Sequence, residues 1–320
     1  MAPEEVGESI GADGVRAMRD AFNVIAGIGR DVTRIAVAAV SDDFGTFDGI
    51  AADGPDDGSG SDAPSLFGLT FEETSATGVV GEGGGEGDCE SGSVMASRGA
   101  IMLTEELLDD GSQISPGDAL AEGESGLCMS PHRMCRYSNL AGGDDGDGLS
   151  EIFGAHTDTS FVTCVPAAAV SGLEVYDEDA ERWYRPELTA RDAWEKEKFE
   201  GGGTGGRTDP NGDARSEIVT TEAGEEVALP WHCRYLVLMP GELMQLVTRN
   251  EVPATVHRVV AVTGGDARLS APVLLRARNH ARMNVGRYVG ESDVAGELLG
   301  ECDGMRMEAV HDAMQPSSFR

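Results

Sequence analysis

The spacing of hydrophobic positions changes along the chain at about residue 128. Over residues 13 to 40, apolar residues recur at steps of three or four with one longer gap, which predicts an amphipathic helix. Asp13 fits the N-cap of this helix, whereas Gly27 and Gly29 weaken its middle and are expected to split it in two. The apolar stripe predicts a face that packs against a core.

From about residue 128 onward, short runs with the alternation of β-strands are separated by clusters of Gly and Asp. These runs are HRMCRYSN, FVTCVPA, GLEVYDE, RYLVLMP, VHRVVAVT and RLSAPVLLRAR. Several short strands at modest spacing predict an antiparallel sandwich or barrel. Residues 189–226 are charged and Gly-rich, so they predict a surface insertion between two strands. The C-terminal residues predict coil followed by a short helix.

These patterns predict a mainly β fold with flanking helices. We expect three regions: a helical and low-complexity N-terminal region at 1–127, a β domain at 128–285 that contains the insertion, and a C-terminal helical extension at 286–320. Residues 41–65 and 78–97 are rich in Gly, Asp, Ser and Glu, which is typical of loops or disordered connections.

The charge of the chain excludes two classes of partner. The net charge is −33, with 57 acidic residues against 24 basic ones. Nucleic acids and anionic membrane surfaces both require Lys and Arg gathered on one face, so we predict neither as a partner. The acidic stretch GEGGGEGD lacks a following Lys-Ser/Thr, which excludes a phosphate-binding P-loop.

The six cysteines contain no CxxC pair, and a chain of 320 residues does not need disulfides to be stable. Reduced thiols and a cytoplasmic protein are therefore expected. In CMSPHRMC, the spacing of Cys128, His132 and Cys135 fits no zinc pattern. The first residues show no apolar signal region, and no run of eighteen apolar residues predicts a membrane span.

The stretch GAHTDTSFVTCV carries two metal-type ligands, His156 and Asp158, in a run that predicts a strand. Residues i and i+2 of a strand point to the same face, so both side chains are expected to aim at one point. His257, in the strand-like run VHRVV, is the candidate for a third ligand. Two His and one carboxylate form the facial triad that is typical of non-haem Fe(II) oxygenases.

A second i, i+2 pair, Arg268 and Ser270, follows His257. An Arg side chain binds a carboxylate through two hydrogen bonds, and a Ser hydroxyl can add a third. A buried Arg needs an anion. A dicarboxylate with one end on the metal and the other on Arg268 would supply it. The remaining histidines show no comparable partners and are expected to be structural or exposed; they are His132, His232, His280 and His311.

Taken in order, HTD, VHRVV and RLS resemble the isopenicillin N synthase-like family of Fe(II)- and 2-oxoglutarate-dependent dioxygenases. The flanking runs GLEVYDEDAERWYRPEL, RYLVLMPGELMQLVTRNEVPATVHRVV and RLSAP are also similar to segments of that family. The resemblance covers about residues 128 to 280. It implies a double-stranded β-helix, or jelly-roll, core for the β domain and an oxidoreductase that oxidises a small organic substrate, with hydroxylation as the default and with release of succinate and CO2.

The resemblance also implies roles for individual residues. His156, Asp158 and His257 would bind Fe(II) and form the catalytic centre. Arg268 and Ser270 would bind the far carboxylate of 2-oxoglutarate, and Tyr137 in RMCRYS would help to hold it. The implied cofactors are Fe(II), 2-oxoglutarate and dioxygen, with ascorbate as an additional candidate.

The chain departs from the family pattern at three places. His156 and His257 lie 101 residues apart, which is longer than is usual in the family and is accounted for mostly by the insertion at 189–226. Cys135 stands where the family often has Asn, and the N-terminal Ile-Pro-x-Ile-Asp strand is absent, which indicates a shortened or divergent form. Two alternatives stay open. One is an iron-dependent oxidase of the same fold that does not use 2-oxoglutarate, and the other is a non-catalytic jelly-roll binding or scaffold protein. The pattern predicts neither the substrate nor the oligomeric state.

Overall fold

The computed structural model describes nine segments of the chain. They are residues 3–40, 100–109, 129–138, 149–200, 216–221, 224–262, 266–278, 280–288 and 297–314. The chain divides into two compact units. The first comprises Met1–Met129, Leu243–Val252 and Arg276–Arg320, and the second comprises Ser130–Glu242 and Pro253–Leu275. The boundaries expected at residues 127 and 285 remain predictions.

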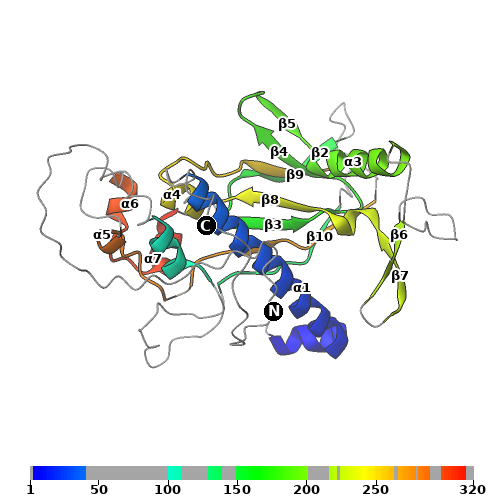
Figure 1. Ribbon diagram of the computed structural model, residues 1–320, viewed down its shortest axis with the longest axis horizontal. Coiled ribbons are helices and arrows are strands. Elements are labelled where there is room, and N and C mark those ends of the chain that lie inside the picture. The colour runs from blue at the N-terminus through cyan, green and yellow to red at the C-terminus, as the bar shows by residue number, and fades with distance from the viewer. Residues whose placement is uncertain are drawn as a thin grey trace, which may run out of the picture. The chain divides into compact units, whose positions relative to one another are not determined.

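The second unit contains a four-stranded antiparallel sheet in the order β2-β9-β4-β5. Its strands are β2 (Leu149–His156), β9 (His257–Val262), β4 (Leu173–Asp177) and β5 (Arg182–Tyr184) (Figure 1). Strand β9 therefore lies between two strands that come much earlier in the sequence. This pairing brings segments that are distant in sequence together at the ends of β2 and β9.

A three-stranded sheet, in the order β11-β3-β8, completes the core of this unit. Its strands are β3 (Val162–Pro166), β8 (Leu236–Pro240) and β11 (Val273–Leu275). Buried Val165 and Met239 of this sheet pack in one cluster with Leu173 and Val175 of the four-stranded sheet. Apolar side chains between facing sheets are removed from water, which stabilises such a sandwich by roughly 25 cal/mol for each Å² buried.

All six runs predicted as strands contain strands in the structure, so the prediction of mainly β structure with flanking helices is confirmed. RLSAPVLLRAR forms two strands, β10 (Arg268–Ser270) and β11, because Pro272 lies between them and provides no N–H for a continuous ladder. Strand β10 pairs with β1 (Cys135–Tyr137). Closure of the sheets into a jelly roll remains a prediction.

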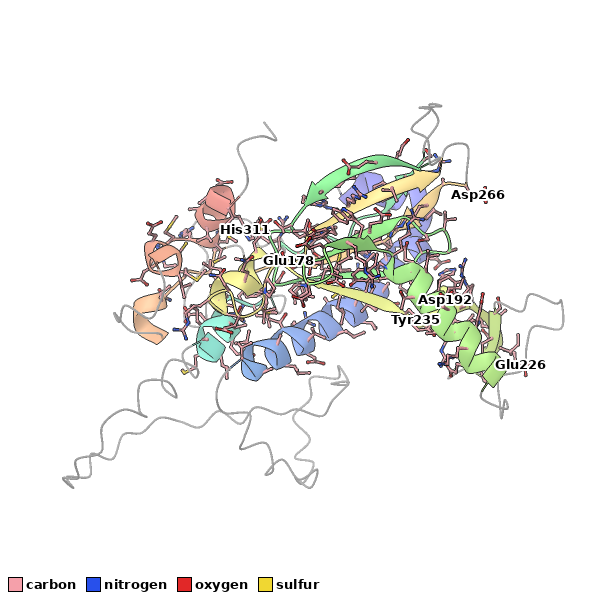
Figure 2. All side chains as sticks on the ribbon, turned by 90° about the horizontal axis from the view of Figure 1, so that it is seen from above. Glu178, Asp192, Glu226, Tyr235, Asp266 and His311 are labelled. Atoms are coloured by element: carbon pink, nitrogen blue, oxygen red, sulfur yellow. The ribbon has the colours of Figure 1, made fainter. Side chains whose placement is uncertain are left out.

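The predicted insertion at 189–226 is largely folded in the residues that the structure describes. It includes most of helix α3 (Pro186–Glu200) and the strand β6 (Ser216–Thr220), which forms a hairpin with β7 (Glu226–Pro230). Figure 2 shows the side chains of α3 and of this hairpin close together. The buried indole of Trp194 lies beneath the guanidinium of Arg234, which also donates to Glu217 on β6.

The first unit begins with the helix predicted for residues 13–40, which extends over Pro3–Ala39 as α1. The expected break at Gly27 and Gly29 is wrong, because the helix continues through both residues. It kinks instead at Gly11, whose φ of 72° is a left-handed conformation that Gly adopts without steric cost. No described helix is long and apolar enough to cross a membrane.

The other helices of the first unit are short. Residues 100–107 are helical, and Arg34 of α1 binds Glu105 there through two hydrogen bonds of 2.6 and 2.9 Å. The C-terminal part contains more helix than the single short one expected. It comprises α5 (Val285–Tyr288), α6 (Glu297–Glu301) and α7 (Met307–Met314), and α4 (Glu242–Val247) precedes them in sequence.

Candidate metal centre

His156 and His257 lie side by side although they are far apart in sequence. His156 is the last residue of β2, His257 is the first residue of β9, and the two are direct partners in the antiparallel pair. Their rings lie 4.3 Å apart between centroids. Opposite residues on one face of an antiparallel pair are close enough for their side chains to act together, so this register brings together two of the three candidate ligands.

Asp158 joins the pair from outside the strand. The expectation that His156 and Asp158 share one strand is wrong in this respect, because β2 ends at His156 and β3 begins only at Val162. The backbone turns here: the carbonyl oxygen of Asp158 accepts hydrogen bonds from the N–H groups of Ser160 and Glu242, at 2.9 and 2.8 Å. The turn directs the carboxylate toward both imidazoles.

A glycine makes this turn possible. A Cβ atom on Gly241 would lie 2.6 Å from the carbonyl oxygen of Asp158 and 2.4 Å from that of Ser160, distances that Cβ atoms do not tolerate. The N–H of Gly241 donates to the carbonyl oxygen of Phe161. The loop that carries Asp158 is therefore fixed against Gly241 and Glu242 by close backbone approach.

The carboxylate of Asp158 is also oriented by a side chain. The Oγ1 hydroxyl of buried Thr163 donates to Oδ2 of Asp158 at 2.6 Å. The same hydroxyl lies 3.1 Å from Oγ of Ser160. A hydrogen bond to a charged acceptor is stronger than one between neutral groups, so Thr163 restricts the directions in which Asp158 can point.

Both imidazoles are held in the same way by backbone carbonyl groups. Nδ1 of His156 lies 2.8 Å from the oxygen of Gly154, and Nδ1 of His257 lies 3.1 Å from that of Thr255. A carbonyl oxygen only accepts, so in each neutral ring Nδ1 carries the proton and Nε2 presents its lone pair to the site. This is the second contact that metal-binding histidines usually make.

The donor atoms converge at distances that suit a single ion. Nε2 of His156 lies 3.8 Å from Oδ1 of Asp158, and Nε2 of His257 lies 3.5 Å from Oδ2. The three ligand atoms lie within 4.8 Å of one another. Two ligands held at right angles, each about 2.1 Å from an ion, lie about 3 Å apart, so a small contraction would complete the site. The residues therefore fit a divalent metal.

Burial favours the metal-binding form of His257. Burial lowers the pKa of His257, and the neighbouring His156 lowers it further, whereas the charge of Asp158 raises it. The net shift of the pKa is downward, so the ring of His257 stays neutral at a lower pH than the ring of an exposed histidine. A neutral imidazole is the form that binds a metal.

Sequence reasoning missed one further carboxyl beside the site, Glu242. Its Oε1 accepts a hydrogen bond of 2.5 Å from Thr157, which lies between the two ligands His156 and Asp158. Burial raises the pKa of Glu242, and the charge of Asp158 adds to the rise while the bond from Thr157 opposes it. The run MPGEL gave no signal for this contact, because it depends on the turn at Gly241.

The structure places Arg268 and Ser270 as their spacing predicts. Both are buried in β10, whereas Leu269 between them is 63% exposed. Across the strand pair, Tyr137 lies opposite Arg268, with the guanidinium 5.6 Å from the centre of its ring, and Cys135 lies opposite Ser270. The three residues expected to bind a distal carboxylate are thus neighbours.

Tyr137 stays protonated in this environment. Burial raises its pKa to about 12, with a further rise from the hydrogen bond and charge of Cys135 and an opposing effect from Arg268 and Arg133. A phenol that keeps its proton can donate a hydrogen bond to an anion. The cysteine that replaces the expected Asn therefore affects Tyr137 directly.

Arg268 already has a carboxylate partner, which sequence reasoning also missed. Its Nε and Nη2 groups donate to Oε1 of Glu187 at 3.1 and 2.7 Å. Glu187 is the second residue of α3 and is 1% exposed, and Arg268 is 2% exposed. The expectation that a buried Arg needs an anion holds, but the anion in the structure belongs to the chain itself.

The comparisons with known proteins give structural similarity alone. No protein-family description matches the sequence, and no curated protein matches it. The chain is similar to the dioxygenase for auxin oxidation from rice, with 18% identity over 70% of this chain and 52% of that one, at a TM-score of 0.31. It is also similar to a full-length Neurospora crassa protein in complex with alpha-KG and thymine, with 14% identity over 64% of this chain and 46% of that one, at a TM-score of 0.31.

A third similar structure is that of dioxygenase for auxin oxidation 1 from Arabidopsis thaliana with 2-oxoglutarate, with 15% identity over 46% of this chain and 38% of that one, at a TM-score of 0.27. The chain thus spans between 38% and 52% of the length of these three structures. At this identity and at these TM-scores, the similarity assigns no function to the chain.

Proposed function

We propose that this chain is an Fe(II)- and 2-oxoglutarate-dependent oxygenase of the isopenicillin N synthase-like kind, acting in the cytoplasm. It would oxidise a small organic substrate, with hydroxylation as the default outcome, and release succinate and CO2. Its sheets would be the two faces of a double-stranded β-helix. The observation that carries the proposal is the convergence of His156, Asp158 and His257, with both Nε2 atoms directed at one carboxylate.

This donor set is selective for a class of chemistry. Two imidazoles and one carboxylate occupy one face of an octahedral ion and leave the opposite positions for small ligands. Fe(II) bound there would supply the activation of dioxygen. The chain contributes the orientation of its ligands: Gly154 and Thr255 fix the imidazoles, and Thr163 fixes Asp158. Such outer contacts tune the affinity for the metal.

The rest of the proposed site lies on strands β1 and β10. Arg268, Ser270 and protonated Tyr137 would receive the distal carboxylate of 2-oxoglutarate, while its 2-oxo acid end would reach the metal. Arg268 is connected to the metal-bearing sheet through Gly172, because a Cβ atom there would lie 2.9 Å from Cδ of Arg268. The N–H of Val260, in the same strand as His257, donates to the carbonyl oxygen of Gly172 at 2.8 Å.

One observation favours a second candidate function. Glu187 already neutralises Arg268, so the chain can satisfy this arginine without a dicarboxylate. An iron-dependent oxidase that does not consume 2-oxoglutarate is therefore the alternative. In that enzyme the metal triad would be unchanged, and β10 would contribute to the fold or bind another carboxylate.

Product analysis tests the proposal and separates these two functions. Purified protein loaded with Fe(II) is supplied with 2-oxoglutarate and dioxygen, and succinate is measured. We expect the wild type to form succinate and His257→Ala to form none. His232→Ala is the matched control, because His232 lies in η2 (Trp231–Arg234), outside the triad, and should leave the rate unchanged.

The outcomes are distinct. If the wild type binds Fe(II) and consumes dioxygen with a substrate but forms no succinate, the oxidase is correct. If Fe(II) binds equally to the wild type and to His257→Ala, the proposed metal centre is wrong and neither function stands.

A further inference from the structure

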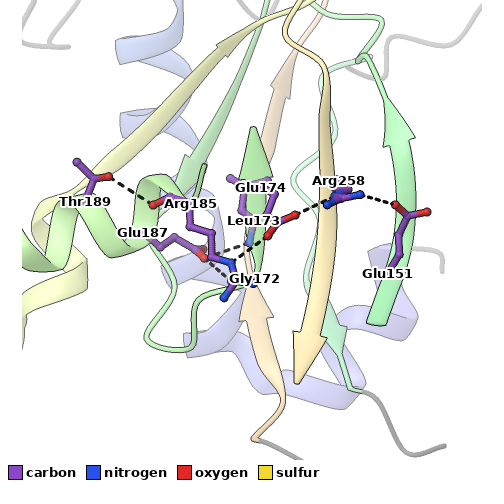
Figure 3. A network of polar contacts seen from close by, with 8 residues as sticks. All are labelled: Glu151, Gly172, Leu173, Glu174, Arg185, Glu187, Thr189 and Arg258. Atoms are coloured by element: carbon purple, nitrogen blue, oxygen red, sulfur yellow. Dashed lines mark hydrogen bonds and ion pairs between the residues drawn. The ribbon is translucent and has the colours of Figure 1, made fainter. Parts of the chain in front are cut away.

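Glu187 is held more firmly than a surface carboxylate. Its two oxygens accept three hydrogen bonds from backbone N–H groups, those of Ala168, Gly172 and Leu173, at 3.3, 2.8 and 3.2 Å. Two more come from Arg268. The bonds to Gly172 and Leu173 are drawn in Figure 3, where Glu187 extends from α3 toward the start of β4. A buried carboxylate with this many donors is fixed in place.

The position of Glu187 matters because Arg268 is a candidate anchor for a ligand. The two bonds to Glu187 use Nε and Nη2, and among the residues that the structure describes Nη1 makes no hydrogen bond, so an incoming carboxylate would approach from the Nη1 side. That carboxylate would share one positive charge with Glu187, inside a region where both partners are almost fully buried. Like charges near each other at low exposure repel, and the repulsion is screened far less than at the surface.

The anchor lies within reach of the metal centre along one strand. Val260, which bonds to Gly172, is three residues beyond His257 on β9. At about 3.3 Å per residue, Val260 lies about 10 Å from His257 along β9, and Gly172, which packs on Arg268, bonds to Val260. A ligand that touches both the metal and Arg268 would therefore bring its distal group close to Glu187.

We propose that Glu187 is a specificity-determining residue that competes with the cosubstrate's distal carboxylate for Arg268. This inference rests on the proposed function. Glu187 lowers the affinity of the site for a 2-oxo dicarboxylate relative to a 2-oxo monocarboxylate, which has no distal charge. The site therefore discriminates only weakly between 2-oxoglutarate and pyruvate.

The test measures binding of both 2-oxo acids by calorimetry, with Fe(II) present and dioxygen absent. Wild type should bind 2-oxoglutarate less than about tenfold more tightly than pyruvate, a difference of about 1.4 kcal/mol. Glu187→Gln keeps the shape of the side chain and removes its charge. It should bind 2-oxoglutarate about 30-fold more tightly than the wild type, or about 2 kcal/mol, and pyruvate with unchanged affinity.

Glu174→Gln is the matched control. Glu174 lies on β4, is also buried, and also pairs with arginines, Arg258 at 2.8 Å and Arg185 at 3.1 Å (Figure 3). Its charge therefore serves two arginines other than Arg268, and its loss should leave the binding of both 2-oxo acids unchanged. An equal gain in Glu174→Gln would mean that overall charge, rather than competition for Arg268, controls binding, and would overturn the proposal.

A double variant locates the effect. Arg268→Gln removes the positive charge for which Glu187 and 2-oxoglutarate compete. Adding Glu187→Gln to this variant should therefore not increase its affinity for 2-oxoglutarate. Weaker binding of 2-oxoglutarate by Glu187→Gln would show that Glu187 positions Arg268 instead, and would overturn the proposal. If Glu187→Gln does not fold, the wild-type preference decides: discrimination against pyruvate by much more than tenfold would overturn it.

Failure of the proposed function has a different signature. If neither 2-oxo acid binds to Fe(II)-loaded wild type or to Glu187→Gln, the 2-oxoglutarate-dependent function is wrong and the competition falls with it. If both bind but the charge of Glu187 has no effect, the function stands and the role of Glu187 alone is wrong.

Discussion

Thr163→Val tests whether the orientation of Asp158 matters for metal binding. The substitution replaces the hydroxyl by a methyl group of similar size and keeps the β-branched shape that suits strand β3. It removes the 2.6 Å hydrogen bond to Oδ2 of Asp158. Thr163 is 2% exposed, so water cannot readily replace the lost donor. Asp158 would keep its place in the backbone turn but lose one restraint on its carboxylate.

The expected magnitude follows from this single contact. A hydrogen bond to a charged group contributes about 1.5 to 3 kcal/mol, and loss of an outer contact to a metal ligand typically weakens metal binding about 10- to 100-fold. The Oγ of Ser160, 3.1 Å from the lost hydroxyl, can turn toward the carboxylate and recover part of the loss. We therefore expect about tenfold to thirtyfold weaker binding of Co(II), used as a spectroscopic substitute for Fe(II).

Titration with Co(II) under anaerobic conditions, followed by its visible absorption, measures this loss. Thr248→Val is the matched control, because Thr248 is also a buried threonine, and its hydroxyl donates to the carbonyl oxygen of Met244 at 2.7 Å. It should lower stability without weakening Co(II) binding. Unchanged affinity in Thr163→Val, together with loss of binding in Asp158→Ala, would refute the claim that Thr163 prepares the ligand.

Two further predictions concern the fold. Gly172→Ala should destabilise the protein by about 1 to 3 kcal/mol in urea denaturation, since a Cβ atom would lie 2.5 Å from the carbonyl oxygen of Val260 and 2.9 Å from Cδ of Arg268; Gly300→Ala, with open space around the added atom, should cost nothing. His311 (Figure 2) is buried, and burial followed by the charge of Arg276 lowers its pKa to about 4, with an opposing effect from Asp312. His311 therefore binds a proton more readily in the unfolded chain than in the folded one. The stability that depends on neutral His311 is complete above pH 6.5 and is lost as the pH falls toward 4. His311→Gln should therefore remove about 2 kcal/mol of the stability loss between pH 7 and pH 5, and an unchanged loss would contradict this reasoning.

The strands were predictable because their patterns depend on local chemistry. Apolar residues at period two, ended by Gly and Asp clusters, specify both the strand and its buried face, and β10 shows this clearly: Arg268 and Ser270 are buried while Leu269 is exposed. The three residues of the triad could also be chosen by residue type and by motif order. Their spatial convergence, however, depends on the register of β2 and β9, which no local pattern contains.

Two errors have the same physical origin. His156 and Asp158 seemed to share a strand because their spacing matches the strand period, but β2 ends at His156 and the carbonyl oxygen of Asp158 accepts turn bonds from Ser160 and Glu242. The helix was expected to break at Gly27 and Gly29, yet it breaks at Gly11. A Gly interior to a helix costs only about 1 kcal/mol, which packing can offset, so composition alone does not locate a break.

Glu187 marks the limit of reasoning from single residues. In the sequence it follows Pro186 at a helix start, where an acidic residue is common because it complements the helix dipole. Nothing local indicates that it also accepts bonds from Gly172, Leu173 and Arg268. The requirement for an anion beside a buried Arg was sound physics, but it specifies a charge and not its source. An internal carboxylate satisfies that requirement as well as a cosubstrate does, so an arginine in a ligand-binding motif identifies a ligand only after the chain's own carboxylates have been placed.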